Sequence, residues 1–217
     1  MSKGVILLSG GLDSLVSLHI ALKTIDVTLA LCFNYGQKAY EEEYLAAKEI
    51  SKHFKIELKT LELPFLAELT KNALTDDLNS SFDDFSSVWV PNRNGLFLNV
   101  AACFCDKLNL DYVIFGANKE EAQKFSDNSV DFISQADLFF KYSTQIHLKA
   151  MAPCQNMNKI EIINYAIDNA LPLNLIKSCY NSKKNSNKKH CGECMSCKLL
   201  YNGIIKSKNP ELIKELF

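Results

Sequence analysis

The chain has 217 residues, 47% of them apolar and 23% charged, which is the composition of an ordinary globular protein with one substantial core. Its formal net charge of −1 provides no overall basic field for holding nucleic acid. The apolar run at residues 5–8 is too short for a membrane span or a signal-peptide core. We therefore expect a cytoplasmic protein without a membrane partner, whose eight cysteines are thiols or metal ligands rather than disulfides.

Hydrophobic periodicity alternates along the chain between short strand-like runs and longer helical runs. Strands are predicted at residues 5–8, 27–33, 56–63, 112–116 and 146–151. Helices are predicted at residues 12–24, 37–54, 94–108 and 159–169, the second with an acidic, exposed first turn. This order predicts an α/β fold, a doubly wound parallel sheet with helices on both faces. Ligands bind such sheets beyond the carboxyl ends of the strands.

Two polar stretches interrupt this pattern. Residues 70–90 are rich in Asp, Ser and Asn and are predicted to form a loop or lid that includes some helix. Residues 177–191 are rich in Lys, Asn and Ser and lack periodicity. We expect an ATP-binding catalytic domain at residues 1–176 and a small metal-binding C-terminal region at residues 177–217 packed on it. Four scattered cysteines are expected to be small core residues: Cys32, Cys103, Cys105 and Cys154.

A polar loop joins the first predicted strand to the first predicted helix. Its residues are Ser9, Gly10, Gly11, Leu12, Asp13 and Ser14. The glycines allow the backbone to approach an anion, the helix N-terminus offers free N–H groups, and the serines add hydroxyl donors. Asp13 is expected to accept N–H groups of the turn or to meet a magnesium ion. The spacing fits neither a Walker A loop nor a GxGxxG motif, and the alternative is a tight turn without a ligand.

The other four cysteines are clustered near the C-terminal end of the sequence. Cys179, Cys191, Cys194 and Cys197 have the spacing C-x11-C-x2-C-x2-C, which suits one tetrahedral zinc ion held by four thiolates. A closed site of this kind has no position for water, so we expect a structural role. An iron–sulfur cluster and four unrelated thiols are the alternatives. His190 is a further potential ligand, although four thiolates already complete the tetrahedron.

The loop at residues 9–14 resembles the PP-loop (SGGxDS) of the ATP-pyrophosphatase superfamily, whose members cleave ATP between the α and β phosphates. Further segments resemble the 7-cyano-7-deazaguanine synthases of queuosine precursor biosynthesis across almost the whole chain. They are FNYGQK at 33–38, VPNRNGLFL at 90–98, GANKE at 116–120, NKIEII at 158–163, SCYN at 178–181 and CGECMSC at 191–197.

This resemblance implies an adenine nucleotide alpha hydrolase-like fold and an ATP-dependent carbon–nitrogen ligase. Such an enzyme converts 7-carboxy-7-deazaguanine and ammonia to 7-cyano-7-deazaguanine, through an adenylated carboxylate and an amide, with release of AMP and pyrophosphate. The resemblance also implies ATP and Mg²⁺, one Zn²⁺ on the four cysteines, and a homodimer. It implies no stable nucleic-acid partner.

The resemblance and the positions at predicted strand ends also imply roles for individual residues. Catalytic roles are expected for Ser9, Asp13, Ser14, Arg93 and Lys159. The nucleotide site is expected to comprise Leu8, Ser9, Gly10, Gly11, Leu12, Asp13, Ser14, Tyr35, Gln37, Lys38 and Gly116. The substrate site is expected to comprise Arg93, Asn94, Asn118, Glu120, Glu121, Phe125 and Asp127. Simpler interpretations are a helix cap or surface role for Arg93, the only arginine, and a plain exposed lysine at position 159.

Two segments depart from the family pattern. Lys38 and Ala39 stand where many members have arginine and histidine, and residues 121–132 read EAQKFSDNSVDF rather than a form close to DYSGYPDCRPEF. The second departure motivates an alternative function, a PP-loop ligase that acts on a different carboxylate or on a nucleic-acid base. A zinc-binding module that recognises nucleic acid is a further alternative, suggested by Lys183, Lys184, Lys188 and Lys189. A solvated loop is the preferred interpretation of those lysines.

Overall fold

The protein is represented by a computed structural model, which describes residues 1–76, 85–181 and 189–217. The strands are β1 (Ser2–Leu7), β2 (Ile25–Asn34), β3 (Glu57–Glu62), β4 (Tyr112–Ile114) and β5 (Lys149–Met151). The α-helices are α1 (Leu12–Ala21), α2 (Tyr40–Phe54), α3 (Phe65–Leu69), α4 (Arg93–Leu108), α5 (Lys119–Ala122), α6 (Val130–Ser143), α7 (Lys159–Asp168), α8 (Met195–Ile205) and α9 (Ile213–Leu216). Short 3-10 turns lie at Phe85–Val88, Ser126–Asn128, Leu173–Leu175 and Pro210–Leu212.

The five strands form one parallel sheet in the order β3-β2-β1-β4-β5. The predicted α/β fold with a parallel sheet is therefore confirmed. The order reverses between β1 and β4, because the chain leaves β1 toward β2 on one side and returns to β4 on the other. The loops after β1 and β4 diverge at this point, which is where an open parallel sheet leaves a crevice for a ligand.

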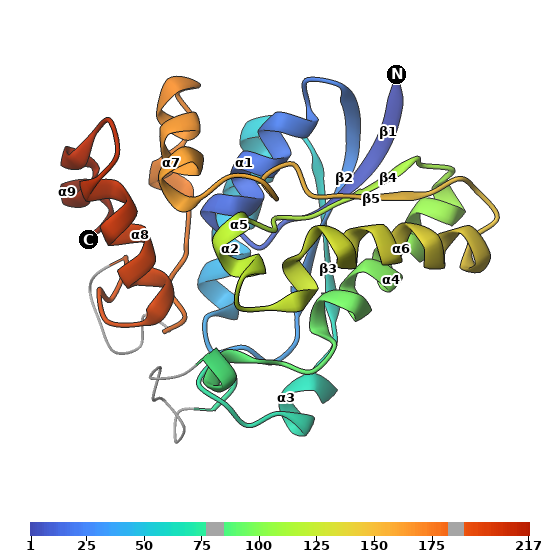
Figure 1. Cartoon of the computed structure of the whole chain (residues 1–217), viewed down its shortest axis with the longest axis horizontal. Coiled ribbons are helices and arrows are strands. Elements are labelled where there is room, and N and C mark those ends of the chain that lie inside the picture. Colours follow the sequence, from blue (N-terminus) through green and yellow to red (C-terminus); the bar gives the residue numbers. More distant parts are fainter. Residues whose placement is uncertain (77–84, 182–188) are drawn as a thin grey trace.

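Both faces of the sheet are buried, and alternate residues of the strands point to opposite faces. Ile6 belongs to a core shared with α1, α7 and α8, whereas its neighbour Val5 belongs to a second core shared with α4 and α6. Figure 1 shows α7 and α8 on the same side as α1, with α4 and α6 on the other side of the sheet. Leu200 and Ile204 of α8 are buried in the first core, so the C-terminal region packs directly on the side of the sheet that carries α1 and α7.

The helix starts follow from local side-chain chemistry. Asn158 and Glu161 form a reciprocal capping box at the start of α7, and the Ser129 side chain caps α6 by accepting from the Phe132 N–H. Helix α2 begins at Tyr40 rather than at residue 37, because the Gln37 side chain binds backbone groups of the preceding turn. Such side-chain bonds compete with helix formation at a terminus.

Several elements were absent from the sequence prediction. Helices α3, α5, α6, α8 and α9 lie in segments for which no helix was predicted. Residues 85–88 of the predicted lid form the short turn Phe85–Val88, in line with the expected helix there, and residues 77–84 of the lid lie outside the described residues. Three of the four scattered cysteines are buried as predicted, but Cys103 is exposed on α4. The prediction was wrong there because α4 is buried on one face only. In the described part of the chain, no helix is long and apolar enough to cross a membrane.

Two glycines allow the PP-loop to pack closely on its surroundings. Gly10 has φ +78°, and a Cβ there would lie 2.6 Å from the Glu43 carbonyl oxygen in α2. A Cβ on Gly116, just after β4, would lie 2.8 Å from the backbone nitrogen of Ser14. The absence of a side chain at Gly10 thus allows both the backbone conformation of the loop and its close packing against α2. The absence of one at Gly116 lets the end of β4 lie against the loop.

We predict that Gly10→Ala lowers the free energy of unfolding by about 2 kcal/mol or more, because strain at a positive φ adds to a backbone clash. Gly192→Ala is the matched control, since Gly192 has φ +77° and a Cβ there would have no described atom within 4 Å. Denaturant unfolding of the metal-loaded proteins measures both changes. Equal losses in the two variants would contradict the packing role assigned to Gly10.

Candidate functional site

A cavity of about 270 Å³ opens at the point where the strand order reverses, between the loops that follow β1 and β4. It brings together most of the residues that were predicted for the nucleotide and substrate sites. Its lining includes Leu8, Ser9, Gly11, Leu12, Asp13, Ser14, Tyr35, Gln37, Arg93, Asn94, Gly116, Asn118, Glu120, Glu121, Phe125, Asp127 and Lys159. Two predicted residues do not line it. Gly10 faces α2 instead, and the Lys38 backbone N–H donates to the Leu74 carbonyl at 2.8 Å.

The PP-loop is held by its own hydroxyl groups. Ser14 Oγ donates to the Gly11 carbonyl at 2.9 Å, and Ser9 Oγ lies 3.3 Å from Ser14 Oγ. The Gly11 N–H donates to Ser9 Oγ at a longer 3.4 Å. These weak internal bonds leave the loop hydroxyls and N–H groups able to exchange their partners for an anion.

Asp13 is the centre of a cluster of charged and polar side chains. Lys159 Nζ lies 2.9 Å and 2.7 Å from the two Asp13 carboxylate oxygens, and Asn118 Nδ2 donates to the same carboxylate at 3.2 Å. The Glu121 carboxylate lies 4.0 Å from the same ammonium. Asp13 therefore binds side chains rather than the backbone N–H groups expected from the sequence. The Lys159 side chain is only 12% exposed, so it is not a plain surface lysine.

Arg93 occupies another part of the cavity and starts α4. Its Nη1 donates to the Tyr35 hydroxyl at 3.3 Å, its Nε donates to Asn94 Oδ1 at 3.3 Å, and the guanidinium lies 5.5 Å from the Tyr35 ring centre. The pKa of Arg93 is raised. Burial alone would lower it, but the neighbouring Tyr35, and after it the charge of Asp127, together outweigh the effect of burial. The Arg93 side chain lines the cavity and is neither a helix cap nor a surface group.

Gln37, which was predicted for the nucleotide site, forms a polar wall with Glu43, which the sequence did not predict. Gln37 Nε2 donates to Glu43 Oε2 at 2.9 Å and to the Phe33 carbonyl at 3.0 Å. Glu43 was expected on an exposed helical turn, but its side chain is partly buried and lines the cavity. The expectation was wrong because the turn before α2 folds Gln37 back beneath this helix, which brings Glu43 toward the strand ends.

Three carboxyl groups of the cavity have raised pKa values, in each case chiefly because burial disfavours the charged form. They are Glu43, Glu121 and Asp127. For Glu121, the attraction of Lys159 partly opposes the rise and repulsion from Asp13 adds to it. Buried carboxyl groups of this kind can take up a proton under conditions in which exposed ones cannot.

Sequence reasoning also missed a wall that comes from outside the α/β core. Lys177, Ser178 and Tyr180 flank Cys179 and line the cavity, as do Met195 and Ser196 at the start of α8. Trp89 and Phe125 add two nearly parallel aromatic rings, with centroids 6.0 Å apart and planes inclined by 11°. The resemblance of the SCYN and CGECMSC segments pointed to the C-terminal part of this wall but gave no role for these lining residues, whereas Phe125 was predicted for the substrate site.

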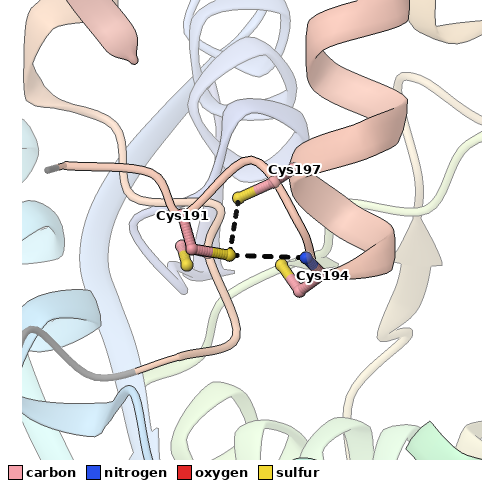
Figure 2. Close-up of side chains that lie close together, drawn as sticks. Cys191, Cys194 and Cys197 are labelled. Atoms are coloured by element: carbon pink, nitrogen blue, oxygen red, sulfur yellow. Dashed lines mark hydrogen bonds between the residues drawn. The ribbon is translucent and has the colours of Figure 1, made fainter. Parts of the chain in front are cut away.

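The four clustered cysteines converge beside this wall. The sulfur atoms of Cys179, Cys191, Cys194 and Cys197 all lie within 4.8 Å of one another. Figure 2 shows contacts of the Cys191 sulfur with both Cys194 and Cys197. This sulfur accepts the Cys194 N–H at 3.3 Å and lies 3.8 Å from the Cys197 sulfur. Zn–S bonds of about 2.3 Å place sulfurs about 3.8 Å apart in a tetrahedral site. The donor set therefore fits a tetrahedral metal ion.

His190 has a different task. Its Nε2 accepts the Ser178 N–H at 3.1 Å, and its Nδ1 lies 2.8 Å from the Leu216 carbonyl oxygen and so carries the proton. The ring is fully buried, and burial lowers its pKa, which keeps it neutral. Both nitrogens are used, so His190 joins the segment before Cys179 to α9 instead of ligating metal. Of the lysines around this loop, Lys183, Lys184 and Lys188 lie outside the described residues, and Lys189 Nζ donates to the Asn174 carbonyl.

Comparison with solved structures places this architecture among known folds. The 4-thiouridine synthetase in an RNA complex with bound ATP has a TM-score of 0.52 at 19% identity, with 77% of this chain and 40% of that chain covered. The U34-tRNA thiolase NcsA of Methanococcus maripaludis has a TM-score of 0.51 at 19% identity, with 79% and 57% covered. The chain thus spans about half the length of these two proteins, and the likeness concerns the fold.

The chain is thus an α/β protein with one parallel sheet and an SGGLDS loop at the reversal of its strand order. Residues 3–208 match the family described as queuosine biosynthesis protein QueC. The 7-cyano-7-deazaguanine synthase of Carboxydothermus hydrogenoformans is 41% identical over 209 residues, covering 91% of this chain and 95% of that protein. The synthase of Methanosarcina mazei is 38% identical over 212 residues, covering 90% of each. The chain belongs to the QueC family.

We predict that Cys194→Ser prevents stable metal binding, because a closed site of four thiolates loses one of its ligands. The melting temperature should fall by about 5 °C or more, since the metal stabilises the wall beside the cavity. Elemental analysis and thermal unfolding measure the two effects. Cys103→Ser is the control, because Cys103 is exposed and lies outside the cluster. A Cys194→Ser protein that keeps one metal ion per chain and its stability would contradict this assignment.

Proposed function

We propose that this protein is a 7-cyano-7-deazaguanine synthase, an ATP-dependent carbon–nitrogen ligase that supplies a precursor of queuosine. The observation that carries the proposal is the cavity at the strand-order reversal, where the PP-loop, Lys159 and Arg93 meet. Membership of the QueC family and the names of the relatives support the product, 7-cyano-7-deazaguanine. The family resemblance implies the substrates, 7-carboxy-7-deazaguanine and ammonia.

The first chemical step is the activation of the substrate carboxylate. One carboxylate oxygen attacks the α-phosphorus of ATP, the bond from this phosphorus to the bridging oxygen breaks, and pyrophosphate leaves. Ser9, Ser14 and the N–H groups that begin α1 are placed to hold the pyrophosphate, whose charge develops as the bond breaks. The Lys159 ammonium, which is bound to Asp13, can instead bind a phosphate oxygen, because Lys159 and Asp13 line the same cavity as the loop serines.

Nitrogen enters in the second step and oxygen leaves in the third. Ammonia attacks the acyl carbon, AMP departs with the carboxylate oxygen, and the attacking nitrogen loses a proton to give the amide. The amide oxygen then attacks a second ATP, and loss of two protons from nitrogen and of AMP leaves the nitrile. The carboxyl groups of Glu43, Glu121 and Asp127 are candidates to accept protons, since burial raises their pKa values.

The end of the cavity around Arg93 suits a planar, negatively charged acceptor. The guanidinium can bind a carboxylate with two parallel hydrogen bonds, and Trp89 and Phe125 offer flat apolar faces to a ring system. Asp127 is a carboxylate able to accept N–H groups of a base. Leu8, Leu12, Tyr35 and Gly116 border the remaining space, which we assign to the nucleotide.

Two metal ions complete the proposal. Zinc suits the four cysteines better than an iron–sulfur cluster, because sulfurs within 4.8 Å of one another fit a single ion, whereas a cluster spreads its thiolates over several iron atoms. We propose that residues 177–217 form a zinc-stapled wall of the cavity rather than an independent unit. Mg²⁺ would be held by carboxylate oxygens of Asp13 and Glu121, because these two carboxylates share a single cationic partner, Lys159. The ion would neutralise part of the charge of the phosphates.

We also propose that the protein is a homodimer that uses the outer face of α6. Leu138, Phe139 and Tyr142 are between 50% and 80% exposed there. Helix α6 packs on β5, an edge strand of the sheet, so a second copy would cover both the exposed apolar residues of α6 and the sheet edge.

Light scattering should give twice the chain mass for the wild type and the chain mass for Phe139→Glu. A monomeric wild type would exclude this interface.

We predict that the zinc-loaded protein, given 7-carboxy-7-deazaguanine, ammonium and MgATP, forms 7-cyano-7-deazaguanine with two AMP and two pyrophosphate for each nitrile. Mass spectrometry of the base and chromatography of the nucleotides measure the yields. Asp13→Ala should lower AMP formation by about 100-fold or more, because Lys159 loses its orienting partner and a ligand for Mg²⁺ is lost. Asp26→Ala, far from the cavity on β2, is the control. Failure of the wild type to form amide or nitrile would overturn the proposal.

The departure at residues 121–132 favours a second candidate, a PP-loop ligase that activates a different carboxylate. Phe125 and Asp127 of this segment line the cavity, so the segment borders the space that we assign to the acceptor. Pyrophosphate release that requires another carboxylic acid, and is not stimulated by 7-carboxy-7-deazaguanine, would identify this second function.

A further inference from the structure

Lys177 is a buried cation for which the proposed site has so far no use. Its residue is only 5% exposed, and it lines the cavity between the turn Leu173–Leu175 and Cys179. The ammonium donates to the Lys189 carbonyl oxygen at 2.8 Å, and within the described ranges no carboxylate lies within 4.0 Å of it. A buried ammonium that is bound to a carbonyl alone is poorly compensated, so the site favours an anion.

The segment that carries Lys177 runs directly along the PP-loop. The Lys177 N–H donates to the Gly10 carbonyl at 2.8 Å, which continues the contact between the β1 end and the C-terminal region. On the other side, a Cβ on Gly11 would lie 3.8 Å from the Lys177 carbonyl oxygen and 3.9 Å from Ser178 Oγ. The Ser178 hydroxyl and the Lys177 backbone therefore face the loop, and Lys177 lines the same cavity.

The charges around the loop show why a further cation matters. The loop itself contains no basic residue and carries the negative charge of Asp13. Lys159 is bound to Asp13 and lies near Glu121, and Arg93 is bound to Tyr35 and Asn94. Pyrophosphate brings several negative charges to this space, which the neighbouring Lys159 alone does not balance.

Glu43 indicates that the charge of Lys177 acts inside the cavity. Burial raises the pKa of Glu43, and the hydrogen bond from Gln37 followed by the charges of Arg93 and Lys177 oppose the rise. Glu43 and Lys177 thus lie close enough for their charges to interact across the cavity lining, although they form no ion pair.

We propose that Lys177 and Ser178 form the second half of the pyrophosphate site, opposite the PP-loop, with Lys177 as a phosphate-binding cation and Ser178 as a hydroxyl donor. This inference rests on the proposed use of ATP and goes beyond it by naming residues outside the SGGLDS loop. It also explains why the zinc-bound region lies where it does. The metal holds the segment from Cys179 onward, and this segment positions the two residues against Gly10 and Gly11.

The test is calorimetric titration of the zinc-loaded protein with inorganic pyrophosphate in the presence of Mg²⁺. Lys177→Met removes the charge and keeps an unbranched side chain; Lys198→Met is the matched control, on the exposed side of α8 and outside the cavity. All samples are compared at one zinc per chain. We expect Lys177→Met to weaken pyrophosphate binding about tenfold or more, and Lys198→Met to change it less than about twofold. Ser178→Ala should weaken it by a smaller factor.

Thermal unfolding with and without pyrophosphate provides a second readout that tolerates a destabilised variant. The wild type and Lys198→Met should gain melting temperature with pyrophosphate, and Lys177→Met should lose most of this gain. Wild-type affinity in Lys177→Met would overturn the inference and leave the proposed function intact. A Lys177→Met protein that cannot be loaded with zinc would assign the lysine to the metal site, which also overturns it. A wild type that binds neither pyrophosphate nor ATP would overturn this inference together with the proposed function.

Discussion

The contact between Asp13 and Lys159 is the interaction on which the rest of the site depends. It joins the PP-loop after β1 to the first residue of α7, and Asn118 adds the loop after β4 to the same carboxylate. Both charged side chains are largely buried, so the pair gains little net stability relative to its desolvation cost. Its value lies in position. Three segments distant in sequence meet at one carboxylate, and they surround the space where the phosphates must lie.

The pair also makes the site adaptable. Without an anion, Lys159 is compensated by Asp13, with Glu121 nearby, and the loop hydroxyls bond within the loop. An incoming polyphosphate can take over the ammonium and the hydroxyls, which leaves carboxylate oxygens for Mg²⁺. The free protein therefore avoids an uncompensated buried charge at Lys159.

The C-terminal region extends this arrangement from outside the sheet. Its four cysteines hold a segment with few apolar residues, and the helix that follows buries Leu200 and Ile204 in the core beside α1 and α7. A metal ion on these cysteines would thus fix the same wall that the hydrophobic helix supports. Loss of either is expected to affect the cavity, because Ser178, Tyr180 and Met195 line it.

The parallel sheet, the PP-loop and the cysteine cluster were predictable because each has a local signal. Alternating runs identify strands, SGGLDS follows a strand directly, and C-x2-C-x2-C needs no knowledge of the fold. Helix α6 was missed, although Ser129 caps it, because Leu138, Phe139 and Tyr142 on its outer face obscure the amphipathic pattern. The pairing of Asp13 with Lys159 spans 146 residues, and the turn of Glu43 into the cavity depends on Gln37. Such contacts arise from the tertiary structure, so periodicity and spacing carry no trace of them.

The central claim is that ATP activates an oxygen of the acceptor by attack at the α-phosphorus while the loop retains pyrophosphate. The most direct measurement uses 7-carboxy-7-deazaguanine with both carboxylate oxygens labelled as oxygen-18, followed by mass spectrometry of the AMP and the pyrophosphate. The account predicts one labelled oxygen in each AMP and none in pyrophosphate, because each carboxylate oxygen departs attached to the α-phosphorus. Label in inorganic phosphate or pyrophosphate, or AMP without any labelled oxygen, would contradict it.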